Sequence, residues 1–272
     1  MKTNIIYNED CLSTMKRFPD SSIDLVVTSP PYDDLRIYNG FSFDFVSVAK
    51  ELYRITKKGG VIVWVVGDTM KNGNKSLTSY RQCLYFQALG FNVYDVMIYQ
   101  KAGGSPPHRN RYNSCFEYMF VLSKGKPKSI NLLKDRINKN AGQYNYTQVK
   151  RREPDGTIGQ RKAKPRTIVP LTSVRQNIWY YAAGFNNGTK DKIAFNHPAI
   201  FPERLAADHI HSWSNEGDII YDPFAGSGTT IKMALQDNRL AIGSEISSEY
   251  CEIIKIRTGV DYIKGENLDT TK

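Results

Sequence analysis

Residues 23–32 read IDLVVTSPPY, an apolar run that ends in a polar, proline-stiffened and aromatic turn. The apolar part predicts a short buried strand, and open α/β sheets bind ligands at the carboxyl ends of their strands. Pro30 and Pro31 fix φ and remove two backbone donors, so acceptors dominate the turn, among them the Ser29 hydroxyl. Tyr32 adds a flat ring with a polar tip. The turn suits a planar ring that carries an NH2 group; the alternative is a tight structural loop with an incidental aromatic.

Apolar runs and amphipathic segments alternate along most of the chain, as expected for a sheet covered by helices. The continuous apolar run at 61–66 is typical of a central parallel strand. We predict strands at 4–7, 23–27, 61–66, 91–100, 117–122, 218–221 and 240–243, and helices at 11–18, 43–55, 79–89, 203–213, 230–236 and 247–257. This alternation predicts the α/β class, with one doubly wound, Rossmann-like sheet.

The composition is that of an ordinary globular chain, with 272 residues of which 40% are hydrophobic, enough for one sizeable core. We expect reduced thiols, a cytoplasmic protein and no metal site, because the cysteines are scattered and form no Cys-x-x-Cys pair. No segment resembles a signal peptide or a membrane span. His209 and His211 would face different ways on a helix, which argues against a metal pair and favours exposed or capping histidines.

The positive charge of the chain is confined to one segment. Residues 124–192 hold 16 basic and 4 acidic residues, a net charge of +12, whereas the rest of the chain has a net charge of −2. Such a localised excess indicates a polyanionic partner, although a solvated lysine-rich surface is the alternative. Interleaved aromatics, such as Trp179 and Tyr180, favour nucleic acid, because bases stack on such rings. We therefore predict a basic recognition insert at 126–194 between two halves of one domain, 1–125 and 195–272.

A second stretch, Tyr221 to Thr230, reads as a strand, a glycine turn and a helix. Gly226 and Gly228 permit a tight turn, and the helix N-terminus behind them offers N–H groups to an anion. The next strand ends at Glu245, whose carboxylate can accept hydrogen bonds from ribose hydroxyls. S-adenosylmethionine fits this arrangement better than NAD, because the turn lacks the third glycine of the dinucleotide fingerprint. A structural corner between strand and helix is the alternative.

Thr28-Ser29-Pro30-Pro31-Tyr32, followed much later by Asp222-Pro223-Phe224-Ala225-Gly226-Ser227-Gly228-Thr229, resembles the DNA amino-methyltransferases of the β group. In that group the catalytic motif comes first, the target-recognition region next and the cofactor motif last, which is a circularly permuted order. The resemblance implies transfer of a methyl group from S-adenosylmethionine to an exocyclic amino group of a flipped base in double-stranded DNA, as in restriction-modification systems. Enzymes of this group are often homodimers, so the resemblance also implies a homodimer.

The resemblance assigns roles to individual residues. It implies a catalytic group made of Ser29, Pro30, Pro31 and Tyr32. It implies cofactor contacts from Asp10, His197, Pro198, Asp222, Phe224, Gly226, Ser227, Gly228, Thr229 and Glu245. The basic loop before 117–122 and the basic insert would supply the DNA contacts, from His108, Arg109, Arg111, Lys150, Arg151, Arg152, Arg161, Lys162, Lys164 and Arg166.

The choice of base depends on Ser29. Family members with serine at the head of this motif mostly modify cytosine N4, and those with aspartate mostly modify adenine N6. We expect N4-cytosine, with N6-adenine as the alternative. An RNA methyltransferase and a non-catalytic DNA-binding module are remoter alternatives.

Overall fold

The computed structural model describes residues 1–31, 44–102, 110–145, 150–160, 167–182 and 188–265, apart from the side chains of Lys71, Lys150, Arg151 and Gln160. The chain divides into two compact units. The larger comprises residues 1–131 and 177–272, and the smaller comprises residues 132–176. No helix in the described ranges is both long and apolar enough to cross a membrane.

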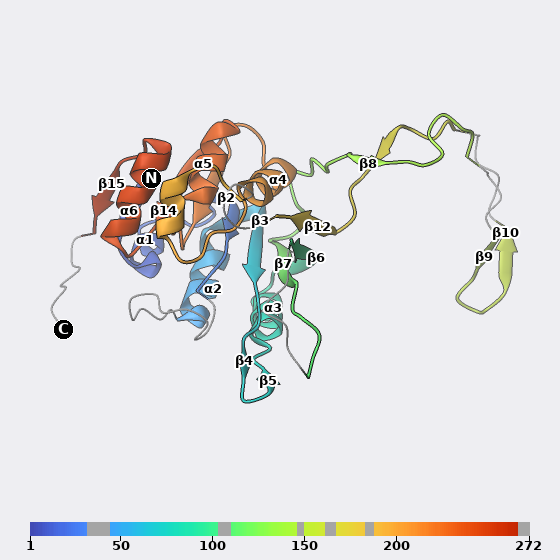
Figure 1. Cartoon of the computed structure of the whole chain (residues 1–272), viewed down its shortest axis with the longest axis horizontal. Helices are drawn as coiled ribbons and strands as arrows, with labels where there is room; N and C mark the ends of the chain where they lie inside the picture. Colours follow the sequence, from blue (N-terminus) through green and yellow to red (C-terminus); the bar gives the residue numbers. More distant parts are fainter. Residues whose placement is uncertain (32–43, 103–109, 146–149, 161–166, 183–187, 266–272) are drawn as a thin grey trace. The chain divides into compact units, whose positions relative to one another are not determined.

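The larger unit is built on a nine-stranded, mostly parallel sheet (Figure 1). Only β7 is antiparallel to its neighbours, which are β3 and β6. Figure 1 shows β2, β3, β7 and β6 following one another across this sheet. In spatial order the strands are β12 (Ile178–Tyr181), β6 (Asn92–Lys101), β7 (Phe116–Ser123), β3 (Thr56–Val66), β2 (Ile23–Thr28), β13 (Ile219–Asp222), β14 (Leu240–Ser244), β1 (Ile5–Asn8) and β15 (Tyr262–Lys264).

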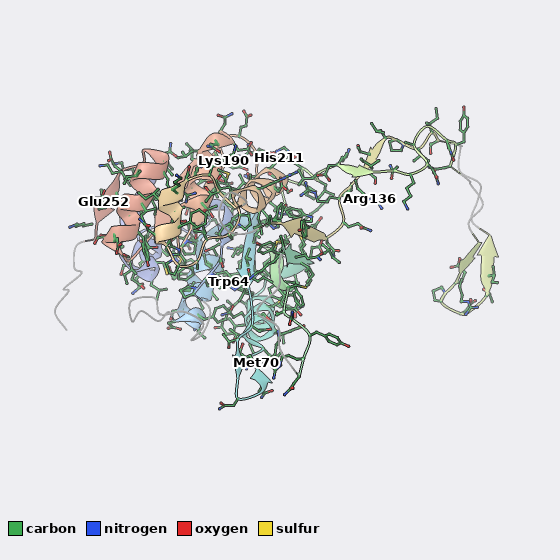
Figure 2. The ribbon with its side chains drawn as sticks, viewed as in Figure 1. Trp64, Met70, Arg136, Lys190, His211 and Glu252 are labelled. Atoms are coloured by element: carbon green, nitrogen blue, oxygen red, sulfur yellow. The ribbon has the colours of Figure 1, made fainter. Side chains whose placement is uncertain are left out.

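Helices cover both faces of the sheet. Successive side chains of a strand point to opposite faces, and β3 is buried on both. On one face α1 (Cys11–Lys16), α2 (Phe45–Ile55) and α3 (Thr78–Ala88) share a core with Trp64 of β3, and Figure 2 shows Trp64 among the packed side chains of this unit. The other helices contact β2, β13, β14 and β1; they are α4 (Glu203–Trp213), α5 (Thr229–Gln236) and α6 (Ser248–Thr258).

The order of the strands reverses between β2 and β13. From β2 the chain passes through α2 to β3 on one side, and from β13 it passes through α5 to β14 on the other. The two strands pair in parallel, with Leu25 opposite Ile220 and Val26 opposite Tyr221. Ligands of open α/β sheets bind outside the carboxyl ends of the strands at such a reversal. The fold therefore brings the ends of the two motif strands to the expected binding edge.

The predicted strands and helices of the larger unit are present, with ends that differ by a few residues. Helix α4 has the predicted bounds, whereas β3 begins five residues earlier, at Thr56. Strands β12 and β15 and the small hairpin of β4 (Met70–Lys71) and β5 (Asn74–Lys75) were not predicted.

The interpretation of Trp179 as a base-stacking residue is wrong. Strand β12 pairs with β6, and Trp179 is 5% exposed, with its ring 4.5 Å from that of His209. The prediction that His209 is exposed or caps a helix is also wrong, because this side chain is buried. Its Nε2 lies 3.2 Å from the sulfur of Met119, and its Nδ1 accepts a hydrogen bond from Trp213. These side chains pack the edge of the sheet against α4.

The smaller unit, residues 132–176, holds two short antiparallel ladders. Strand β8 (Arg136–Ile137) pairs with β11 (Thr172–Ser173), and β9 (Lys150–Arg152) pairs with β10 (Ile158–Gln160). An ion pair between Arg175 and Asp135 joins the two ends of the unit. The short helix η1 (Lys192–Asn196) follows in the larger unit.

Candidate active site at the carboxyl edge of the sheet

The ends of β2 and β13 are joined by side chains. The Thr28 hydroxyl donates to Asp222 Oδ1 at 2.6 Å, and the Thr230 hydroxyl donates to the carbonyl of Val27 at 3.0 Å. Ser29, half-buried, and Pro30, buried, follow Thr28 directly. The catalytic motif and the glycine motif, almost 200 residues apart in the sequence, are therefore neighbours in the fold.

Asp222 connects the two motifs through hydrogen bonds to Thr28 and Phe224. It is 1% exposed, and its Oδ1 also accepts the backbone N–H of Phe224 at 3.0 Å. Burial raises the pKa of this carboxyl to about 6, although the hydrogen bond from Thr28 acts in the opposite direction. The structure thus shows Asp222 fixing the start of the glycine turn, and a direct contact with a cofactor stays a prediction.

The glycine turn needs its glycines. Gly226 and Gly228 have φ of +53° and +79°, a region that other residues rarely adopt. A Cβ at Gly226 would lie 3.0 Å from Nε2 of His197, and one at Gly228 would lie 2.9 Å from Ile254. Helix α5 begins directly after Gly228, and no side chain within the described ranges caps it. Its first N–H groups therefore face the end of the sheet without a side-chain acceptor.

Glu245 lies against this turn at the end of β14. Its Oε2 accepts the N–H of Gly226 at 2.8 Å and its Oε1 accepts the N–H of Ser247 at 2.9 Å. A carboxylate has about four acceptor positions, so about two remain for hydroxyl donors. Burial raises the pKa of Glu245 to about 7.

His197 closes the turn from the other side. Its buried ring lies edge-on to Tyr250, 4.4 Å between centroids, and its Nδ1 accepts the N–H of Ala199 at 3.1 Å. Pro198, next in sequence, is exposed.

Asp10 lies at the same edge, at the end of β1. Its side chain caps α1 by accepting the N–H of Leu12 at 2.8 Å. The neighbouring Asn8 donates from Nδ2 to the carbonyls of Glu245 and Ile246, at 2.9 and 3.0 Å, and so ties the end of β1 to the end of β14. Asp10 and Glu245 therefore belong to adjacent strand ends.

Three residues for which the sequence predicted no role of their own support the site, namely Thr28, Asn8 and Arg257. Thr28 is the first residue of its motif, and its hydrogen bond to Asp222 was not predicted. Arg257 donates to the carbonyl and the hydroxyl of Ser227, inside the glycine turn. In the sequence it reads only as a cation in the last turn of a helix, the usual preference at that position.

Several predicted residues are not placed. Tyr32 lies outside the described residues, as do His108, Arg109, Arg161, Lys162, Lys164 and Arg166. The side chains of Lys150 and Arg151 are likewise not described, and Arg111 and Arg152 are exposed. Among the described residues no three His, Cys, Asp or Glu side chains form a metal-binding group. The cysteines in the described part of the chain are free thiols, and all of them except Cys115 are buried.

The chemistry of the edge fits a nucleoside that carries an anionic group. Glu245 offers acceptors for two hydroxyls, and the N-terminus of α5 offers N–H groups and the positive end of a helix dipole to an anion. Ser29 and Pro30 offer acceptors one strand away.

Comparison with known proteins agrees with this geometry. Residues 23–256 match a family model described as DNA methylase, N6_N4_Mtase. The orphan methyltransferase M.BamHII of Bacillus amyloliquefaciens is 56% identical over 238 residues, which cover 88% of this chain and 89% of that protein.

Solved structures share the fold. One is the PvuII DNA methyltransferase, described as cytosine-N4-specific, with a TM-score of 0.68, 21% identity and coverage of 98% of this chain and 87% of that one. Another is TTHA0409 of Thermus thermophilus in complex with S-adenosylmethionine, with a TM-score of 0.64, 23% identity and coverage of 97% and 99%. The family model, which spans most of the sequence, and the relative that shares more than half of its residues lead to one conclusion: the chain belongs to the N6/N4 amino-DNA methyltransferase family.

Proposed function

We propose that the chain is a modification methyltransferase of the restriction-modification type that methylates the N4 amino group of a cytosine flipped out of duplex DNA. The observation that carries the proposal is the hydrogen bond between Thr28 and Asp222, which puts the Ser-Pro-Pro acceptors beside the glycine turn. The motif order along the chain, catalytic motif first and glycine motif last, favours a permuted, doubly wound methyltransferase sheet.

The methyl donor is S-adenosylmethionine, and the strand ends divide its recognition. Glu245 would hold the ribose hydroxyls, and the N-terminus of α5 would hold the carboxylate. The adenine would lie beside Asp10. The remaining contacts would come from His197, Pro198, Asp222, Phe224, Gly226, Ser227, Gly228 and Thr229.

The catalytic residues act on the amino group of the base. When bound, the cofactor supplies a methyl group on a positively charged sulfur, so transfer forms one N–C bond, breaks one C–S bond and releases one amine proton. Ser29 Oγ and the Pro30 carbonyl would accept hydrogen bonds from the two N–H groups of the amine and draw its nitrogen toward pyramidal geometry. Pro31 stiffens this turn, and Tyr32 would stack on the base. Holding both reactants in line would supply much of the rate.

The serine at position 29 favours cytosine N4 as the acceptor, and adenine N6 is the second candidate because the family includes both activities. The test incubates the protein and duplex DNA with methyl-labelled cofactor and digests the product to nucleosides. We expect N4-methylcytosine. Finding N6-methyladenine as the only labelled nucleoside would replace cytosine with adenine.

A variant of the motif separates catalysis from folding. Ser29→Ala should reduce turnover by at least about 100-fold, in the range that positioned catalytic groups contribute, with little change in cofactor affinity. Ser13→Ala, on the exposed face of α1, is the matched control and should leave both unchanged. Equal loss of turnover and cofactor affinity in Ser29→Ala would point to a structural role for the motif.

DNA recognition is assigned to the basic insert at 126–194 and to the loop with His108, Arg109 and Arg111. Flipping the target base costs a few kcal/mol of unstacking, which phosphate contacts help to offset. The insert residues that would make these contacts are Lys150, Arg151, Arg152, Arg161, Lys162, Lys164 and Arg166. A homodimer is also expected, and light scattering during size-exclusion chromatography tests it; a monomeric mass at working concentration would contradict it.

A further inference from the structure

Arg257 is buried between the glycine turn and the segment that covers it. Its side chain is 0% exposed, and Nη1 donates to the carbonyl and the hydroxyl of Ser227 and lies 3.4 Å from the hydroxyl of Thr229. The same guanidinium donates from Nε to Asp191 at 3.1 Å and from Nη2 to Glu203 at 2.8 Å. One side chain on α6 thus contacts three separate parts of the fold.

The contact with the Ser227 carbonyl fixes a whole peptide group. The N–H of Gly228, the other end of that peptide, donates to the carbonyl of Ala225 at 2.7 Å. Both ends of the Ser227–Gly228 peptide are therefore held, and its plane cannot rotate without breaking a hydrogen bond. That plane sets the direction from which the first N–H groups of α5 emerge. The hydroxyls of Ser227 and Thr229 are turned toward Arg257 and do not cap α5.

A second cation completes the arrangement. Lys232, on α5, donates to Oδ2 of Asp191 at 2.7 Å and to Oε1 of Glu203 at 2.8 Å, the same two atoms that Arg257 contacts. Burial alone would raise the pKa of Asp191, but the hydrogen bonds from Lys232 and Arg257 hold it below its usual value. Two cations and two carboxylates thus form a balanced network, which burial makes costly to break.

The two carboxylates, of Asp191 and Glu203, flank the segment 192–202 in the sequence. This segment carries His197, whose ring lies against Gly226. Arg257 and Lys232 therefore hold both ends of the segment and the turn beneath it in one arrangement. We infer that Arg257 is a positioning residue of the cofactor site, which presents the N–H groups of α5 to the cofactor's carboxylate and fastens residues 191–203 over the glycine turn. This inference rests on the proposed binding of S-adenosylmethionine at that turn.

The test compares Arg257→Lys with wild type by calorimetric titration with S-adenosylmethionine and by steady-state kinetics on duplex DNA. Lysine keeps the charge but cannot reach three partners with a planar fork. We expect the Kd for the cofactor to rise about tenfold or more, the loss expected for one or two charge-assisted hydrogen bonds. The kcat at saturating cofactor and the KM for DNA should stay within about twofold, a split that general loosening of the fold would not produce.

Two further variants complete the experiment. Lys255→Met changes a half-exposed cation of the same helix, paired with Asp261, and should bind the cofactor as wild type does. Asp191→Asn weakens the network on the side of the covering segment, keeps Arg257 paired with Glu203, and should raise the cofactor Kd by a smaller factor; it also serves if Arg257→Lys does not fold. An unchanged Kd in folded Arg257→Lys or, failing that, in Asp191→Asn would overturn the inference. A wild-type protein that does not bind S-adenosylmethionine would instead overturn the proposed cofactor site.

Discussion

The Thr28 hydroxyl donates to the buried carboxylate of Asp222 at 2.6 Å, and this bond joins the catalytic strand to the cofactor strand. Thr28→Val keeps the shape of the side chain but leaves Asp222 with one donor fewer. We expect the free energy of unfolding to fall by about 2 kcal/mol, as for a buried hydrogen bond to a charged group, and methyl transfer to slow. Urea unfolding and initial rates measure both.

Thr28→Ser is the control for that prediction. Serine keeps the hydroxyl and loses only a methyl group, so most of the stability and rate should return. If Thr28→Ser were as damaging as Thr28→Val, the methyl packing at Thr28 and not the bond to Asp222 would join the strands.

The buried carboxyls make stability depend on pH. Burial raises the pKa of Asp222 to about 6 and that of Glu245 to about 7, from values of 3.8 and 4.5. Between its unfolded and its folded pKa, each group holds a proton in the folded state that the unfolded chain has lost. The contribution of the two groups to the free energy of unfolding is therefore greatest below about pH 4 and is lost as the pH rises through 6 and 7. For each group the loss is on the order of 3 kcal/mol.

The measurement is urea unfolding of the cofactor-free protein at pH 5 and pH 8. Glu245→Gln removes one of the titrating groups, so its stability relative to wild type should rise between the two pH values. Because the comparison is a difference, carboxyls elsewhere in the chain cancel. A constant difference at both pH values would show that Glu245 does not titrate in this range.

The glycine turn provides a test with a built-in control. Gly228 and Gly217 have nearly equal φ, +79° and +78°, but a Cβ at Gly228 would lie 2.9 Å from Ile254, whereas one at Gly217 would meet nothing within 4 Å. Gly217→Ala should cost about 1–2 kcal/mol through backbone strain alone. Gly228→Ala should cost about 1–3 kcal/mol more, from overpacking, and should weaken cofactor binding. Equal losses in the two variants would show that Ile254 yields freely.

The sequence predicted the parts of this fold that depend on local patterns. The continuous apolar run of β3, the helical spacing of α2 and the glycines after β13 each follow from residues close together in the chain. Ser29 and Gly226 were singled out because turns at strand ends carry their chemistry in a few adjacent residues. Even their proximity follows from the rule for parallel sheets, because both turns lie at carboxyl ends.

What the sequence did not predict depends on partners far along the chain. Strand β12 has four residues in a polar, basic surrounding, and it becomes a strand by pairing with β6, where Ile178 lies opposite Ile98. Its alternation of buried and exposed side chains is too short to distinguish from a loop with aromatics. Arg257 is similar, because its partners Ser227, Asp191 and Glu203 come together only in the folded chain.

The basic insert leads to a prediction about salt. Arg152 is exposed on β9, where a side chain can reach a phosphate. Arg152→Ala should weaken DNA binding and reduce the slope of log K against log salt concentration by about 1, with cofactor affinity unchanged. Lys16→Ala, an exposed cation of α1, should leave the slope unchanged. Fluorescence anisotropy over a salt series measures this, and equal slopes for Arg152→Ala and wild type would exclude a phosphate contact.

Two neighbouring aromatics of β12 distinguish packing from base stacking. Trp179 is 5% exposed and packs on His209, whereas Tyr180 is 64% exposed. Trp179→Ala should lower the free energy of unfolding by about 3–5 kcal/mol, and its folded fraction should bind DNA as wild type does. Tyr180→Ala should change stability by no more than about 0.5 kcal/mol, because its ring faces solvent.

If Trp179→Ala weakened DNA binding while stability stayed constant, the tryptophan would act on DNA and not in the core. Urea unfolding and anisotropy on the same samples separate the two outcomes, because a core residue changes the first measurement and a stacking residue changes the second.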